Sequence, residues 1–191
     1  MEDHRIILAG LIKQSRIRGT HAYGLAHWDH SLHVEKAHRI EDITIPRANK
    51  IIYHNRYSTS GDYHNHENNQ PIRVGSCALV FNGVLDMRTK KEIESDLGIT
   101  METENDGEIL IQLCGSDPAA MQAYIAQTKG SFAGLMLTEE NKMYALRNEN
   151  RPLWRLEHQG AVFYASTKDI FKRVDAALDP QPLAPNQIYE S

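Results

Sequence analysis

The order of local signals along the chain constrains its fold more than any other feature of the sequence. Short runs with strand character lie in the first and last thirds, and capped helices lie between them. Units in which single strands alternate with helices form parallel sheets, whereas grouped strands pair with their neighbours as antiparallel sheets. The chain is therefore predicted to be an α+β protein with largely antiparallel sheets, layered as a helix–sheet–sheet–helix sandwich.

Five helices are predicted from apolar spacing or from capping residues. The first covers 6–17, where the apolar positions follow a helical period, and Gly19 ends it. A capping box, Thr89 with Glu92, begins the second, and Asp117 followed by a proline begins the fourth. The remaining two helices are expected over 107–114, with Asp106 as a candidate N-cap, and over 167–174, with Ser166 as N-cap.

Six runs are predicted to be strands because they are short, β-rich and bounded by polar residues. They are 22–28, 50–54, 76–81, 131–137, 142–147 and 161–165. The third is expected to end at Asn82-Gly83, a turn dipeptide. Residues 59–71 are almost all polar, so they form a long loop of the kind that often carries function.

Length and composition limit the function classes. A chain of 191 residues without repeats or linkers is expected to form one domain over 1–191. The net charge of −4 provides no cationic surplus for nucleic acid, and no apolar run is long enough to span a membrane. The chain begins without the pattern of a signal peptide, so a cytoplasmic protein is expected. Its two cysteines, Cys77 and Cys114, are interpreted as buried thiols of a reducing compartment.

The densest group of polar residues that could form a functional site follows the second predicted strand. Arg56 lies at this strand end, where a rigid strand would present it beside an adaptable loop, and a guanidinium is suited to a carboxylate. Asn82 and Gly83 could donate to a developing oxyanion, and Asp106 could bind an ammonium group. Each also has a purely structural interpretation: a surface ion pair for Arg56, a hairpin turn for Asn82-Gly83 and a helix cap for Asp106. The run 147–153 is interpreted as a turn with solvated charges.

Taken in order, these blocks resemble the glutaminase domain of class II glutamine amidotransferases, of the amidophosphoribosyltransferase and glucosamine-6-phosphate synthase type. The resemblance covers nearly the whole chain, and an ordered set is far more specific than any single block. The blocks are Arg18–Gly24, His54–Thr59 with Gly61, Asn68–Pro71, Ala78–Gly83, Glu104–Asp106 with Glu108, Gly130–Ala133, Arg147-Asn148, Arg151–Leu153 and Ala165–Thr167.

The resemblance implies an N-terminal-nucleophile (Ntn) hydrolase fold, which is an αββα sandwich, and the hydrolysis of L-glutamine to glutamate and ammonia. By the same resemblance the residues would take the following roles: Arg56 and Thr59 would bind the α-carboxylate, Asp106 the α-ammonium group, Asn82 and Gly83 would form the oxyanion hole, and Arg18 and Gly19 would shape the pocket. No cofactor or metal is implied. Because no synthase domain is expected in this chain, a separate ammonia-accepting synthase is the implied partner.

The nucleophile of this family is an N-terminal cysteine, whose free α-amine is also the general base. The sequence begins Met1-Glu2 at its first helix, so this cysteine and its strand are missing from it. Cys77 and Cys114 lie in apolar runs and are expected in the core. A truncated start is the preferred interpretation. The alternatives are a catalytically inactive homologue that binds glutamine or regulates a synthase, and one half of a split protein.

A metal-dependent nuclease is a competing hypothesis, based on the ten histidines of the chain. They include an evenly spaced set, His27, His30 and His33, and a loop pair, His64 and His66. Metal ligation needs geometry and supporting contacts that spacing alone cannot establish. Solvated loop histidines are the preferred interpretation.

Overall fold

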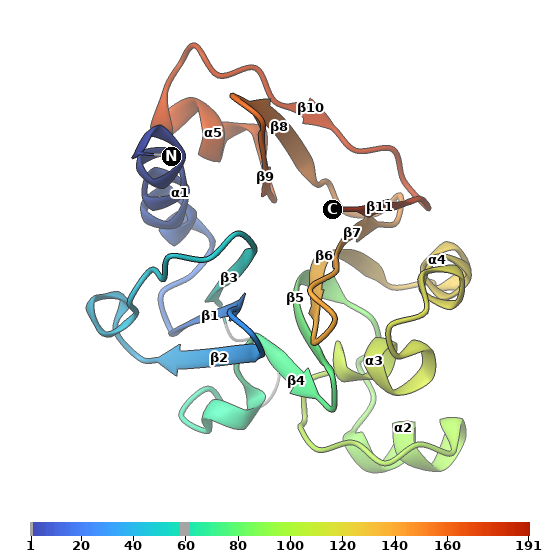
Figure 1. Ribbon diagram of the computed structural model, residues 1–191. Coiled ribbons are helices and arrows are strands. Elements are labelled where there is room, and N and C mark those ends of the chain that lie inside the picture. The colour runs from blue at the N-terminus through green and yellow to red at the C-terminus, as the bar shows by residue number, and fades with distance from the viewer. Residues whose placement is uncertain (1, 58–61) are drawn as a thin grey trace.

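The computed structural model describes residues 2–57 and 62–191 (Figure 1). Its helices are α1 (Glu2–Ser15), α2 (Lys90–Leu97), α3 (Glu108–Cys114), α4 (Pro118–Gln127) and α5 (Lys168–Val174), with short 3-10 turns η1 (Arg16–Arg18), η2 (Ile40–Asp42) and η3 (His66–Asn68). Its strands are β1 (Ala22–Trp28), β2 (Leu32–Ala37), β3 (Ile51–Arg56), β4 (Ile72–Val74), β5 (Cys77–Val84), β6 (Ser131–Thr138), β7 (Met143–Arg147), β8 (Trp154–His158), β9 (Ala161–Ala165), β10 (Gln181–Pro182) and β11 (Ile188–Glu190).

The strands form three sheets, and every pairing among them is antiparallel. One sheet has five strands in the order β11-β7-β6-β5-β4. The other two have three strands each, in the orders β2-β1-β3 and β10-β8-β9. The antiparallel character expected from the grouping of the strands is therefore confirmed.

The five-stranded sheet is covered on both faces, and β5 shows how. Successive strand side chains point to opposite faces. Leu79 and Phe81 pack in one cluster with Leu110 of α3 and Met121 of α4. The intervening Ala78 and Val80 pack in another cluster, which contains side chains of the sheet β2-β1-β3. The helices α3 and α4 thus cover one face of the five-stranded sheet and a second layer of strands covers the other.

Both three-stranded sheets lie in this second layer. Ile52 of β3 packs on β5 and β6, and Leu153, just before β8, packs on Ala133 and Ala145 of the five-stranded sheet. On the outer side, Ile7 of α1 and Phe171 of α5 pack on β8 and β9. The order is helix, sheet, sheet, helix, which confirms the predicted αββα sandwich (Figure 1).

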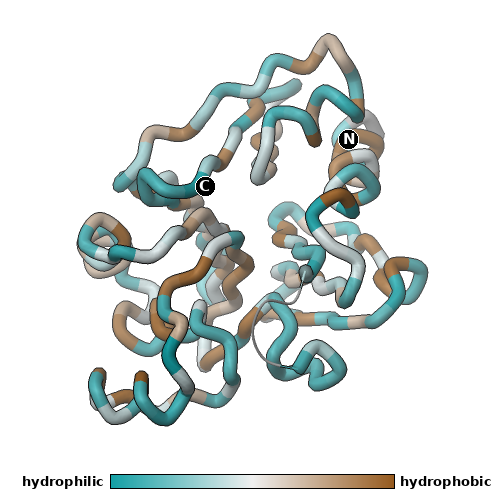
Figure 2. The backbone as a smooth tube through the Cα atoms, turned by 180° about the vertical axis from the view of Figure 1, so that it is seen from behind, coloured by the Kyte–Doolittle hydropathy of each residue, from teal (hydrophilic) through white to brown (hydrophobic). Residues whose placement is uncertain are grey.

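Hydropathy follows this layering. Hydrophobic stretches run through the central strands, and the long connections at the rim are mostly hydrophilic (Figure 2). No helix within the described part of the chain combines the length and the apolar character that crossing a membrane requires.

Two predicted helix starts are confirmed atom by atom. Thr89 and Glu92 form a reciprocal capping box at α2, and the Asp117 carboxylate accepts from Ala119 N and Ala120 N at α4. The expected cap at Ser166 is wrong: α5 has Thr167 as N-cap, without a side-chain hydrogen bond. Helix α5 is instead held by packing of Ile170 and Phe171, which are buried.

Several predicted boundaries also change. The strand expected to end before Asn82-Gly83 continues through both residues to Val84, because β6 pairs with it as far as Ser131. Strands β2, β4, β8, β10 and β11 were not predicted. β2 is exposed or half-buried along most of its length, so its sequence lacks a continuous apolar signal. Its pairing with β1 holds it in extended form.

Candidate functional site

A cavity of about 390 Å³ lies between the two strand layers. Its walls come from β3, β5, β6 and β9, and from the residues that precede α3. Among the predicted site residues, five line it: Arg18, Arg56, Asn82, Gly83 and Asp106. Gly19 lies beside it, and Thr59 is outside the described residues. The volume is in the range of a small-molecule site.

Arg56, the last residue of β3, is a buried cation at the wall of this cavity. Its side chain is on the same face of β3 as Ile52, which points toward the five-stranded sheet. Only 5% of the residue is exposed, and its Nη1 donates to Asn68 O at 2.7 Å and to Asn69 Oδ1 at 2.6 Å. Burial lowers the pKa of the Arg56 guanidinium. The structural interpretation as a surface ion pair is therefore wrong.

Buried amides connect Arg56 to the segment that carries Asp106. Asn68 Oδ1 accepts from Glu104 N at 2.9 Å, and Asn105 Nδ2 donates to Asn68 O at 3.1 Å. Glu108 anchors the same segment from α3, where its fully buried carboxylate accepts from Glu102 N and Thr103 N at 2.6 and 2.7 Å. The polar residues after β3 and those before α3, far apart in sequence, thus form one network.

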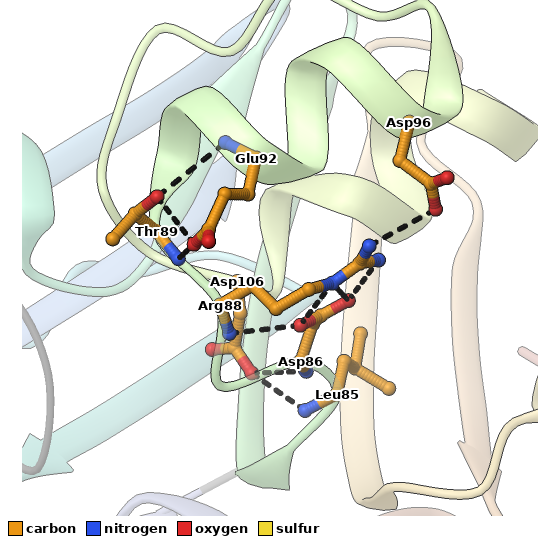
Figure 3. Close-up of polar contacts among 7 residues, drawn as sticks. All are labelled: Leu85, Asp86, Arg88, Thr89, Glu92, Asp96 and Asp106. Carbon is orange, nitrogen blue, oxygen red and sulfur yellow. Dashed lines mark hydrogen bonds and ion pairs between the residues drawn. The ribbon is translucent and has the colours of Figure 1, made fainter.

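Asp106 lines the same cavity, where the backbone that follows β5 holds it (Figure 3). Its Oδ2 accepts from Leu85 N at 2.5 Å and from Asp86 N at 3.1 Å. Burial raises the pKa of this carboxyl group, and the backbone N–H groups of Asp86, Leu85 and Asp106 itself oppose the rise. Asp106 does not cap α3, whose N-cap is Gly107 without a side-chain cap, so that interpretation is wrong. No other described residue donates a hydrogen bond to Oδ1.

Asn82 and Gly83 lie inside β5 rather than in a hairpin turn, so the turn interpretation is also wrong. Asn82 shares a face with Ala78 and Val80, so its side chain points into the space between the layers. In an antiparallel pair, only every second residue of a strand forms backbone hydrogen bonds to a given neighbouring strand. The hydrogen bond from Glu139 N to Ser76 O shows that the even-numbered residues of β5 bond to β6. Gly83 therefore directs its N–H away from β6. Its φ of 146° and a Cβ position only 1.9 Å from Ser131 O require glycine here.

Arg18 and Gly19 close the cavity beside the end of β3. A Cβ on Gly19 would lie 2.4 Å from the carbonyl group of Arg56, so only glycine permits this close approach. His21 N donates to Arg56 O at 3.0 Å, and this hydrogen bond fixes the backbone at the same end of β3.

The cavity is also lined by residues for which the sequence analysis predicted no individual role in the site. They include His54, Gln70, Asn105, Arg151 and Tyr164. Gln70 Oε1 accepts from Phe81 N at 2.6 Å, and Arg151 Nε donates to Ser131 Oγ at 3.1 Å. Four of the five, all but Tyr164, belong to the sequence blocks quoted above, so the residues could be found in the sequence although their arrangement around the cavity could not.

The run 147–153 is more ordered than predicted. Asn148 is buried, where its Oδ1 accepts from Phe132 N and its Nδ2 donates to Gly130 O. Arg147 Nη1 donates to the carbonyl oxygens of Asn148 and Arg151. The predicted turn is present at 149–150, but Arg147 is not simply solvated, because Arg147 and Asn148 satisfy backbone groups at the start of β6 and within the run itself.

His54 is held as neutral imidazole at the cavity wall. Burial, with Arg56 and Arg18 nearby, lowers the pKa of His54 to about 3. Its Nδ1 is shielded from solvent and has no hydrogen-bond partner among the described residues.

The pKa of His54 predicts a pH dependence of stability. Above about pH 6.5 the imidazole is neutral in both the folded and the unfolded chain, so it contributes nothing. Between pH 6.5 and about 3 only the unfolded chain takes up the proton, so the free energy of unfolding decreases as the pH falls, by at most about 1.4 kcal/mol per pH unit. Urea unfolding from pH 7 to pH 4 should show a shallower decrease for His54→Asn. The control His30→Asn, at a side chain that is 95% exposed, should keep the original slope. Equal slopes for both variants would contradict this interpretation of His54.

Neither cysteine lines the cavity. Cys77 is buried on the helix-facing side of β5, and burial raises the pKa of its thiol. Burial also raises the pKa of Cys114, at the end of α3, to about 11. Across residues 2–57 and 62–191, no group of three or more His, Cys, Asp or Glu side chains is arranged to hold a metal ion.

Comparison with known proteins identifies the fold. No family model and no curated protein matches the chain. Among solved structures, a glutamine phosphoribosylpyrophosphate (PRPP) amidotransferase from B. subtilis, complexed with ADP and GMP, superimposes with a TM-score of 0.69 at 20% identity, over 97% of this chain and 45% of that one. A structure of the allosteric regulatory enzyme of purine biosynthesis has a TM-score of 0.74 at 23% identity, over 98% of this chain and 46% of that one.

These similarities confirm that the chain has an Ntn-hydrolase-like fold, as the ordered sequence blocks predicted. The chain spans less than half the length of either matched structure.

Proposed function

We propose that the chain is a single glutaminase domain of the class II amidotransferase type, which binds L-glutamine and releases its amide nitrogen as ammonia for a separate acceptor enzyme. The observation that carries the proposal is a buried guanidinium, Arg56, and a buried carboxylate, Asp106, at the wall of one cavity. A free amino acid has one group complementary to each of them. The fold shared with the PRPP amidotransferase structure supports the same function.

In this proposal Arg56 binds the α-carboxylate, with help from Thr59, and Asp106 binds the α-ammonium group through Oδ1. The side-chain amide would then extend toward Asn82 and Gly83. The Asn82 amide and the Gly83 N–H, which β6 does not use, are suited to stabilise the oxyanion of a tetrahedral intermediate. Arg18 and Gly19 shape the adjoining corner.

Hydrolysis also needs a nucleophile, and neither cysteine of the chain can reach the cavity wall. We therefore expect a form that is extended at its N-terminus by a strand beginning with cysteine to release ammonia, and the 191 residues to bind glutamine without hydrolysing it. The position of the cysteines favours a second candidate function, a glutamine-binding or regulatory module that does not hydrolyse glutamine. Both candidate functions predict that the chain binds glutamine, but only the glutaminase predicts release of ammonia.

Calorimetric titration of the 191-residue chain tests the binding site that both candidates share. L-glutamine should bind with one-to-one stoichiometry and D-glutamine at least tenfold more weakly, because two charged groups fix the α-carbon substituents. Asp106→Asn should weaken L-glutamine binding at least tenfold by removing the partner of the ammonium group. The control Asp117→Asn, at the exposed cap of α4, should leave the affinity unchanged. Absence of L-glutamine binding at millimolar concentration would reject the proposed site.

A further inference from the structure

We infer that Arg88 is a positioning residue for Asp106: it fixes the backbone that binds the Asp106 carboxylate, and it balances the negative charge of Asp86 beside that carboxylate. Arg88 does not line the cavity and lies in the connection between β5 and α2 (Figure 3). The inference deepens the proposed function and rests on it in one respect, the ammonium group that Asp106 would bind.

Asp86 links Arg88 to Asp106. The backbone N–H of Asp86, together with that of Leu85, donates to Asp106 Oδ2. The Asp86 carboxylate is held by Arg88 through four hydrogen bonds. Its Oδ1 accepts from Arg88 N at 2.9 Å and from Nε at 3.1 Å, and its Oδ2 accepts from Nε at 3.1 Å and from Nη2 at 2.7 Å. Because these bonds fix Asp86 as a residue, they also fix the direction of the N–H that it presents to Asp106.

A further contact of Arg88 ties the same segment to α2. Arg88 Nη1 donates to Asp96 Oδ2, in the last turn of this helix, at 3.0 Å. A guanidinium is suited to hold two carboxylates because it bonds each of them with different nitrogens. The exposed fractions of the side chains are 44% for Arg88, 19% for Asp86 and 60% for Asp96. Since exposed ion pairs add little to the free energy of unfolding, we expect Arg88 to act on Asp106 rather than on overall stability.

Arg88 also balances the charge next to Asp106. Burial is the main cause that raises the pKa of Asp106, and the negative charge of Asp86 adds to the rise. Side-chain hydrogen bonds from Arg88 hold the pKa of Asp86 below its usual range, so Asp86 remains ionised near neutral pH. Without the guanidinium, the charge of Asp86 would act on Asp106 uncompensated, and the pKa of Asp106 would rise further.

Other charged or titratable groups also surround Asp106. They are Glu104 and Glu108 of the adjoining chain, Tyr124 of α4, and Arg18, His54, Arg56 and Arg151 along the cavity. All of these groups are retained when Arg88 is replaced, so a changed pKa of Asp106 in such a variant reports on the contacts of Arg88.

Nuclear magnetic resonance of the 191-residue chain with carbon-13-labelled aspartate measures the pKa of Asp106 without glutamine. The signal that is missing from Asp106→Asn identifies this residue. Arg88→Met retains the length of the side chain without its charge, so it should raise the pKa of Asp106 by at least about half a pH unit. Arg88→Lys restores a positive charge and should recover at least half of this change. In an Asp86→Asn chain, Arg88→Met should change the pKa of Asp106 less than half as much, because the charge that Arg88 balances is gone.

The consequence for glutamine is a changed pH profile of binding. Asp106 must be ionised to bind an ammonium group, so the affinity falls as the pH falls through the pKa of Asp106. Calorimetry between pH 7 and pH 4.5 should place this fall at a higher pH for Arg88→Met, by the same amount as the rise in the pKa. The control is Arg39→Met, since Arg39 forms a comparable two-pronged pair with Asp42 and does not line the cavity. It should change neither measurement.

An unchanged pKa of Asp106 in Arg88→Met would overturn the inference. An equal change in the Asp86→Asn chain would also overturn it, because Arg88 would then act without Asp86. A loss of Tm in Arg88→Met that Arg39→Met does not show would assign Arg88 a structural role instead of a positioning one. If the original chain does not bind glutamine, the proposed function fails, whereas the pKa of Asp106 is measured without glutamine and still decides the inference.

Discussion

Arg56→Ala is expected to weaken L-glutamine binding about 100-fold. The buried guanidinium is the cation proposed to bind the α-carboxylate, and truncating one partner of a buried, charge-assisted contact typically costs a few kcal/mol. Calorimetry with L-glutamine measures the change. Arg56→Lys should give an intermediate loss, because an ammonium group retains the charge but cannot form the two-pronged contact of a guanidinium.

The control for this prediction is Arg173→Ala. Arg173 is an exposed residue of α5 that forms an ion pair with Asp169 one helical turn away, so its loss should leave the affinity for glutamine unchanged. A melting curve for each variant separates loss of binding from loss of fold. If folded Arg56→Ala binds L-glutamine as tightly as the original chain, the assignment of the carboxylate site is wrong.

Glu108→Ala is expected to lower the free energy of unfolding by about 3–5 kcal/mol. The carboxylate is fully buried and accepts four hydrogen bonds. Oε1 accepts from Glu102 N and from Gln112 Nε2, at 2.6 and 2.9 Å. Oε2 accepts from the backbone N and the Oγ1 of Thr103, both at 2.7 Å. Alanine would leave these donors buried without an acceptor, and urea unfolding measures the loss.

Glu92→Ala is the matched control, since Glu92 is also a helical glutamate that accepts from backbone N–H, but at the exposed capping box of α2. Its loss should cost about 1 kcal/mol, because water can replace the missing acceptor. Glu108→Gln should fall between the two, since its amide retains one acceptor oxygen and turns an NH2 group toward a donor. Equal losses for Glu108→Ala and Glu92→Ala would contradict the anchoring role of Glu108.

The predictions from sequence succeeded where the deciding contacts are local. The caps of α2 and α4 involve atoms at most three residues apart, and the patterns at Thr89 and Asp117 specify them fully. Apart from the helix cap expected at Ser166, they failed where a distant partner decides. The strand β2 depends on pairing with β1, and β5 continues through Asn82-Gly83 because β6 lies beside it.

The same distinction between local and distant contacts applies to the candidate site. The identity of its polar residues could be predicted, because the blocks around Arg56, Asn82 and Asp106 recur in a recognisable order. The burial and the hydrogen-bond partners of these side chains could not be predicted. Asp106 has the position of a helix cap, yet its Oδ2 accepts from Leu85 N and Asp86 N, which a local pattern does not reveal.

The sequence by itself determined the types of element, their grouping into antiparallel sheets, and the inventory of charged and amide side chains for a site. These depend on periodicity and on hydrogen bonds within a few residues. Only the tertiary structure decided that Arg56 and Asp106 share one cavity, and that β3 and β9 both border it. The reason is that packing of two sheet layers brings together residues far apart in the chain, and hydrophobic burial, which drives this packing, is not directional.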